Sequence, residues 1–281
     1  LENHPMTVVM VLIAANVLFS YQGFRDETFK AKYLFNVGAI LKRKEYIRLL
    51  SSGFLHANWG HLFWNMLGIY LFGDDLLAWM GTTKFLMIYL LSLFGGDLFS
   101  LLAHKNHQDY SSLGASGAVI GVVFAFIALN PTTSLYIILL PGISFPAWAF
   151  GVGYLFISMY GMRSLTSNTG HEAHIGGAIV GILITIILKP AHTLGSHPLP
   201  ILAVLLPAMA FMAVLIWKPK WWMRAEIESN VPSSETLEDK YHTERKNKEN
   251  ELNVLLEKVA RVGYEGLLPH ERQRLDELSG K

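Results

Sequence analysis

Long apolar runs separated by short polar connections make up most of the chain before residue 223. A helix needs about 20 mostly apolar residues to cross a bilayer. The candidate runs are Met6–Tyr21, His61–Phe72 with an apolar extension to Met80, Lys84–Ala103, Ser116–Leu129, Ser144–Tyr160, His171–Leu188 and Leu199–Trp217. This pattern predicts an all-α polytopic membrane protein in which a six-helix core is followed by a seventh, C-terminal span.

The alternation of apolar and polar segments also divides the chain into parts. We predict a six-helix core at 1–190 with a long first loop at 22–58, an extra transmembrane helix at 191–222, a polar linker at 223–250 and a helix-turn-helix tail at 251–281. The first loop mixes aromatic residues with Lys and Arg, which is typical of a structure that lies in the membrane interface. The first apolar run lacks the basic start and the Ala-x-Ala site of a signal peptide, so we expect it to be retained.

The tail has the helical spacing of apolar residues. These residues are Leu252, Leu255, Leu256 and Val259 in one segment, and Leu275 and Leu278 after Pro269 in the next. A helix pair this small buries too little apolar surface to be stable alone. We therefore expect the tail to dock on another surface or to self-associate.

Composition agrees with lipid as the main solvent. Of the 281 residues 52% are hydrophobic and 16% are charged, whereas soluble domains carry about 25% charged residues. Moreover, 23 of the 45 Asp, Glu, Lys and Arg residues lie in the segment 224–281. No basic cluster interleaved with aromatics indicates nucleic-acid binding, and the absence of cysteine excludes disulfides, thiolate catalysis and Cys-based metal sites.

Polar side chains gather at the starts of three predicted spans. Such side chains are costly to place in a membrane, so they indicate a functional site. They are His56, His61 and Asn65 at the second span, Ser116 at the fourth, and His171, Glu172 and His174 at the sixth. Each has an ordinary alternative: Ser116 as a helix cap or packing residue, and His61 with Asn65 as an interhelical hydrogen-bond pair. His171 and His174 share a helix face and are a conceivable metal pair. However, "HEAH" is not the His-Glu-x-x-His zinc signature and no carboxylate cluster accompanies it, so we predict neither a metal nor a cofactor.

Spacing along the helices favours a catalytic arrangement of these side chains. His61 and Asn65 lie four residues apart on one face, and both are hydrogen-bond donors that could hold an oxyanion. Ser116 begins a helix, where backbone N–H groups are unpaired, and His174 is a candidate general base.

Small residues at four-residue spacing follow both catalytic candidates. Gly117 and Gly121 form such a face after Ser116, and Ala173, Gly177 and Gly181 form another around His174. Faces of this kind let two helix backbones approach closely in a membrane. If these two faces pack, the serine hydroxyl meets the imidazole, which is the geometry of a base-activated nucleophile.

Taken together, these motifs resemble those of the rhomboid family of intramembrane serine proteases. The residues that carry the resemblance are "HANWGHLFWNM", "GASG" and "AHIGG", in this order on the second, fourth and sixth spans, with Arg48 eight residues before His56. The resemblance covers roughly residues 5–190. It implies a six-helix rhomboid core and hydrolysis of a peptide bond in or beside the transmembrane helix of a membrane-protein substrate, through an acyl-enzyme.

The resemblance also implies roles for individual residues. Ser116 would be the nucleophile and His174 the general base of a dyad without an acid. The backbone N–H of Ser116 and the side chains of Asn65 and His61 would line the oxyanion hole. Structural or packing roles would fall to Arg48, His56, Gly114, Gly117, Gly121 and Gly177.

Three positions depart from the family pattern. The family often has Trp-Arg in the first loop, where this chain has Ile47-Arg48. Some members stack a tyrosine, four residues after the serine, on the catalytic histidine; here that residue is Ile120, so another group must orient the ring. A glutamate common near the end of the second span has no obvious counterpart.

Location and orientation follow in part from the resemblance. We expect a multi-pass protein of the bacterial plasma membrane. The positive-inside rule would put the side of the first loop in the cytoplasm, whereas the family places its active site on the extracytoplasmic side, and we follow the family. With seven spans, the tail would share that side. If Leu199–Trp217, which Pro207 interrupts, does not span, the tail stays in the cytoplasm.

Two other functions compete with proteolysis. A catalytically silent family member that binds membrane clients would typically lack the serine or the histidine, and both are present. A transporter would use the intramembrane histidines and Asp97. The simpler interpretation of Asp97 is that it marks a helix end or makes a polar contact.

Overall fold

A computed structural model describes residues 5–136, 142–162 and 170–218, and in the tail residues 251, 255–256, 258–259 and 263–279. The chain divides into two compact units, Leu1–Pro232 and Ser233–Lys281. The predicted linker 223–250 and Leu252 lie outside the described residues.

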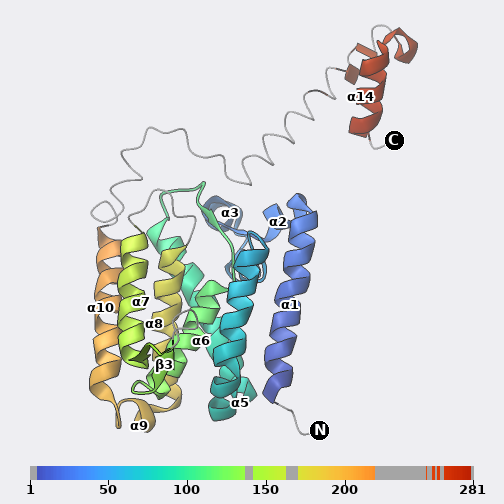
Figure 1. The fold of residues 1–281 in the computed structure, drawn as a ribbon. Helices are drawn as coiled ribbons and strands as arrows, with labels where there is room; N and C mark the ends of the chain where they lie inside the picture. Colours follow the sequence, from blue (N-terminus) through green and yellow to red (C-terminus); the bar gives the residue numbers. More distant parts are fainter. Residues whose placement is uncertain are drawn as a thin grey trace. The chain divides into compact units, whose positions relative to one another are not determined.

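Helices dominate the first unit (Figure 1). Its helices are α1 (Pro5–Arg25), α2 (Glu27–Tyr33), α3 (Val37–Arg43), α4 (Arg48–Ser51), η1 (Ser52–Phe54), α5 (Trp59–Ala103), α6 (Ser116–Leu129), α7 (Ala147–Gly161), α8 (His171–Leu188), α9 (Pro190–Thr193) and α10 (Pro198–Trp217). Two short antiparallel pairs complete it, β1 (Phe35–Asn36) with β2 (Ser111–Ser112) and β3 (Ser134–Tyr136) with β4 (Ser144–Pro146).

The predicted all-α polytopic fold is confirmed. Within the described part of the chain, α1, α5, α8 and α10 are long and apolar enough to cross a membrane, and α6 and α7 are shorter apolar helices. The second and third predicted spans both lie in α5, which loses helical geometry at Gly81 (φ 76°, ψ 164°). A positive φ is accessible mainly to glycine, so Gly81 is where the chain turns between these spans. The first three residues of the predicted fifth span form strand β4 instead of helix.

Helix α6 occupies the centre of the bundle, and α5 and α8 pack against it (Figure 1). Nearly all of its residues after Ser116 are buried, including Phe124 and Val122. Its 14 residues span only about 21 Å at 1.5 Å per residue, against about 30 Å of hydrocarbon. Helix α6 is therefore too short to reach across the hydrocarbon by itself.

Helix α10 runs beside α7 and α8 and is antiparallel to α8 (Figure 1). Pro207 lies inside it without ending it. The last residue of α10, Trp217, therefore lies at the same end of the bundle as His171, the first residue of α8.

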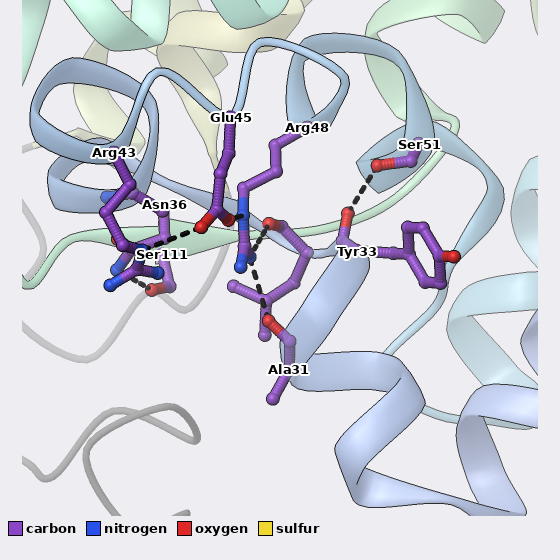
Figure 2. A network of polar contacts seen from close by, with 10 residues as sticks. Ala31, Tyr33, Asn36, Arg43, Glu45, Arg48, Ser51 and Ser111 are labelled. Carbon is purple, nitrogen blue, oxygen red and sulfur yellow. Dashed lines mark hydrogen bonds and ion pairs between the residues drawn. The ribbon is translucent and has the colours of Figure 1, made fainter. Parts of the chain in front are cut away.

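The first loop is a folded structure built around Arg48 (Figure 2). Its side chain is 4% exposed and donates one hydrogen bond of 2.8 Å to each of the carbonyls of Ala31 and Leu34. It also donates to Glu45 at 2.6 Å. Burial by itself raises the pKa of Glu45, but hydrogen bonds from Arg48 and Arg43 outweigh burial and hold that pKa below its usual value. Glu45 is therefore a carboxylate that fixes the guanidinium.

Replacing Arg48 by alanine is expected to lower the free energy of unfolding by about 3 kcal/mol, since two buried carbonyls and a carboxylate lose their donor. Thermal denaturation in detergent measures the loss. Arg43→Ala is the matched control, because Arg43 pairs with the same Glu45 at 2.8 Å but its side chain is 47% exposed. That variant should lose less than about 1 kcal/mol. Equal losses in the two variants would contradict an anchoring role for Arg48.

The first loop is joined to the segment that precedes α6. Strand β1 pairs with β2, and the N–H groups of Val37 and Gly38 donate to the carbonyls of Tyr110 and Gln108 at 3.1 and 2.9 Å. The loop thus holds the chain that leads into Ser116.

The tail unit contains the 3₁₀ turn η2 (Tyr264–Gly266) and helix α14 (Pro269–Ser279). Leu255, Leu267 and Leu275 are buried together in it. Ion pairs join Lys258 to Glu271 at 2.5 Å and Arg274 to Glu251 at 2.9 Å.

Candidate active site

Ser116 is the first residue of α6 and follows a tightly held loop. Gly114 has φ 135°, which glycine tolerates best, and a Cβ there would stand 2.7 Å from Cε1 of His61. The N–H of Gly114 donates to the carbonyl of Ser52 at 3.0 Å. The glycine before the serine is thus required both by backbone conformation and by the close approach of His61.

The histidine of the sixth predicted span meets this serine. Nε2 of His174, in the first turn of α8, lies 2.7 Å from Oγ of Ser116. Both side chains are partly buried. A hydroxyl and an imidazole at this distance can exchange a proton directly.

Backbone contact between α6 and α8 produces this distance. A Cβ on Gly177 would lie 2.1 Å from the carbonyl oxygen of Gly117, and one on Gly181 would lie 2.3 Å from that of Gly121. Gly121 itself packs on Ser92 of α5. The two helices can approach this closely only because these positions carry no side chain.

Asn65 and His61 lie in the first two turns of α5, and His61 stands against Gly114. The Asn65 side chain is buried and its Nδ2 donates to the carbonyl of His61 at 2.9 Å. Asn58 caps the start of α5 by accepting from the N–H of His61 at 2.9 Å. These contacts fix the donor pair beside the loop that contains Gly114.

His56 connects α1 to the same loop. Burial, with a smaller contribution from His61, lowers the pKa of His56 to about 3, so the ring is neutral. Its Nε2 accepts from the N–H of Ala115 at 3.4 Å, and its Nδ1 lies 2.8 Å from Oγ of Ser20. Ser20 in turn donates to the carbonyl of Phe54 at 3.1 Å. The three bonds form one chain, in which Ala115 donates to His56, His56 donates to Ser20, and Ser20 donates to the carbonyl of Phe54.

Asp97, for which the sequence indicated a helix end or a polar contact, makes a polar contact that supports the loop before α6. Ser52 donates from Oγ to Oδ2 of Asp97 at 2.6 Å, while the carbonyl of Ser52 holds Gly114. Asp97 therefore supports the nucleophile loop through Ser52.

The sequence did not point to Tyr154, and it named Glu172 without a role. The hydroxyl of Tyr154, on α7, lies 2.9 Å from Nδ1 of His174. Glu172 is buried at the start of α8, where it contacts the hydroxyl of Tyr110 and lies 3.3 Å from Nε2 of His104. One feature of the sequence could have indicated a role for Tyr154. It lies in the middle of a predicted span, whereas tyrosine is more typical of span ends.

His174 directs one ring nitrogen at Ser116 and the other at Tyr154, and not at His171. The two histidine rings lie 5.9 Å apart and nearly perpendicular. Among the described residues, no group of three or more His, Cys, Asp or Glu side chains could hold a metal ion.

Comparison with known proteins identifies similarities to both units. The family model described as "Rhomboid domain" matches residues 43–191, and a "Family of unknown function (DUF6576)" matches residues 235–281.

Similar proteins include rhomboid protein 1, mitochondrial, of Saccharomyces cerevisiae, which is 30% identical over 65% of this chain and 53% of that protein. RHOMBOID-like protein 12, mitochondrial, of Arabidopsis thaliana is 26% identical over 65% of this chain and 58% of that protein. Rhomboid protease AarA of Providencia stuartii is 28% identical over 59% of this chain and 63% of that protein. The chain thus spans little more than half the length of the first two relatives.

Proposed function

The chain belongs to the rhomboid family, and on this premise we propose that it is an intramembrane serine endopeptidase. The observation that carries the proposal is the 2.7 Å separation between Oγ of Ser116 and Nε2 of His174. The printed name of the Providencia stuartii relative, a rhomboid protease, supports it. Its substrates would be membrane proteins cleaved in or near a transmembrane segment.

The reaction needs one base and one nucleophile. Nε2 of His174 accepts the hydroxyl proton as Oγ of Ser116 attacks the carbonyl carbon of the scissile peptide bond. His174 then gives this proton to the leaving amine, and the C–N bond breaks to leave an acyl group on Ser116. Water deprotonated by His174 attacks this ester, and the serine recovers its proton as the new carboxyl product leaves.

Negative charge develops on the carbonyl oxygen during both attacks, and three groups could stabilise it. The backbone N–H of Ser116 lies at the N-terminus of α6, where the helix leaves its first N–H groups without internal partners. Asn65 and His61 are fixed in the first turns of α5, and His61 stands against Gly114, two residues before Ser116. An amide has two N–H donors, so the bond from Asn65 to the carbonyl of His61 leaves a second one for the oxyanion.

A competing interpretation is a catalytically silent family member. It would need no proton transfer between Ser116 and His174, and their short separation favours the enzyme. A transporter is a weaker alternative. Among the described residues, Asp97 accepts a hydrogen bond from Ser52 and so already has a structural partner.

Labelling with a fluorophosphonate tests the nucleophile directly. Oγ of Ser116 is expected to form a bond to phosphorus as fluoride leaves, so the wild type should be labelled and Ser116→Ala should not. Ser112→Ala, four residues earlier, is the matched control and should be labelled like the wild type. Labelling of Ser116→Ala at the wild-type rate would overturn the assignment.

The protein is an integral multi-pass membrane protein. The bacterial plasma membrane remains our prediction, since the relatives named above come from mitochondria and from a bacterium. For the tail we propose docking or self-association. The compact unit Ser233–Lys281 and the separate family match at 235–281 support a boundary within the predicted linker.

A further inference from the structure

The imidazole of His174 is contacted on both of its nitrogens. Nε2 faces Oγ of Ser116 at 2.7 Å, and Nδ1 faces the hydroxyl of Tyr154 at 2.9 Å. The two side chains therefore lie on opposite edges of the ring, and Tyr154 occupies the edge that an acid occupies in a Ser-His-Asp triad.

Proton transfer from Ser116 to His174 determines whether the hydroxyl of Tyr154 donates or accepts. A neutral imidazole carries one N–H, and Nε2 must be the unprotonated nitrogen if it is to accept the Ser116 proton. Nδ1 then carries the hydrogen, and its partner must accept. A tyrosine hydroxyl has lone pairs for this purpose.

The surroundings of Tyr154 leave its hydroxyl able to accept from His174. Its hydroxyl is also hydrogen-bonded to the side chain of Ser158, one turn later on α7. The phenolic hydrogen can point to Ser158 and leave a lone pair for Nδ1–H. The ring of Tyr154 is also held in place without its hydroxyl, because it packs on the rings of Phe124 and Phe150. The distances between ring centroids are 5.9 and 6.4 Å.

We infer that Tyr154 is a positioning residue that orients His174 and keeps the proton on Nδ1, an inference that rests on the proposed function. It fills the gap left by Ile120, which cannot hydrogen-bond to the ring. When His174 becomes an imidazolium during the reaction, the same oxygen accepts from a charged donor, and such bonds are stronger than neutral ones.

Removal of the hydroxyl alone tests this inference. Tyr154→Phe keeps the ring contacts, and it is expected to lower kcat for a transmembrane substrate by about tenfold to a hundredfold, with KM unchanged and the melting temperature lowered by only a few degrees. Tyr160→Phe makes the same chemical change on α7 at a side chain that is 75% exposed, and it should match the wild type.

Nitrogen-15 spectra of labelled histidine add a readout that a packing role would not move. The His174 signals, identified by their loss in His174→Gln, should show a hydrogen on Nδ1 in the wild type and a mixture of tautomers in Tyr154→Phe. A wild-type hydrogen on Nε2, or an unchanged kcat in Tyr154→Phe, would overturn the inference. If Tyr154→Phe fails to fold, Ser158→Ala replaces it, with a smaller expected loss of kcat at constant KM.

The same preparations separate this inference from the proposed function. Cleavage by the wild type and none by Ser116→Ala supports the protease whatever Tyr154→Phe does. Absence of cleavage and of fluorophosphonate labelling in the wild type would overturn both.

Discussion

Ser116→Ala and His174→Ala are each expected to lower kcat by about 10⁴-fold or more, while the protein still inserts in the membrane. Removal of Oγ takes away the atom that forms the acyl-enzyme, and removal of the imidazole takes away the base 2.7 Å from it. Cleavage of a model transmembrane substrate in liposomes, followed on gels, measures the loss.

Two matched variants control for nonspecific effects. Ser112→Ala lies in the same segment of chain, and His197→Ala lies just before α10, away from the dyad; both should cleave like the wild type. Full activity in either dyad variant would exclude the proposed mechanism. A dyad variant that loses insertion as well would be replaced by Ser116→Cys or His174→Gln.

Gly177→Ala is expected to reduce both stability and activity, with a loss of about 3 kcal/mol in the free energy of unfolding and about 100-fold in kcat. The added Cβ would stand 2.1 Å from the carbonyl oxygen of Gly117, so α6 and α8 must move apart. A displacement of about 1 Å between reacting groups is enough for a rate loss of this size. Thermal denaturation in detergent and the cleavage assay give the two values.

Gly153→Ala provides the matched control for this substitution. Gly153 also lies in a helix, α7, but a Cβ there meets no atom within 4 Å. Alanine is the better helix former by about 1 kcal/mol, so this variant should be as stable as the wild type or slightly more so, with unchanged kcat. A Gly177→Ala variant that behaves like Gly153→Ala would mean that the α6–α8 contact does not set the distance within the dyad.

Hydrophobic pattern was sufficient to predict an all-α membrane fold, because most of the apolar runs are long and most are separated by polar segments. The turn at Gly81 was harder to predict. The sequence shows a glycine between two apolar runs, but it does not show that this glycine has a positive φ. Small-residue spacing suggested which faces of the fourth and sixth spans pack, since Gly117 and Gly177 reveal by their size where backbones can meet.

Contacts between distant helices could not be predicted in this way. Nothing in the local sequence links Tyr154 to His174 or Asp97 to Ser52, because each pair depends on how α5, α7 and α8 are rotated about their axes. Spacing within one helix indicates which residues share a face. It does not indicate which other helix packs against that face.

Helix α1 has a mechanical connection to the nucleophile although it lies at the edge of the bundle. Ser20 on α1 holds His56, and His56 holds the N–H of Ala115, the residue before Ser116. Asn16, one turn earlier, donates to the hydroxyl of Tyr89 at 3.2 Å. A sliding movement of α1, for example when a neighbouring helix presses on it from the lipid, would therefore pull directly on the loop that aims the serine.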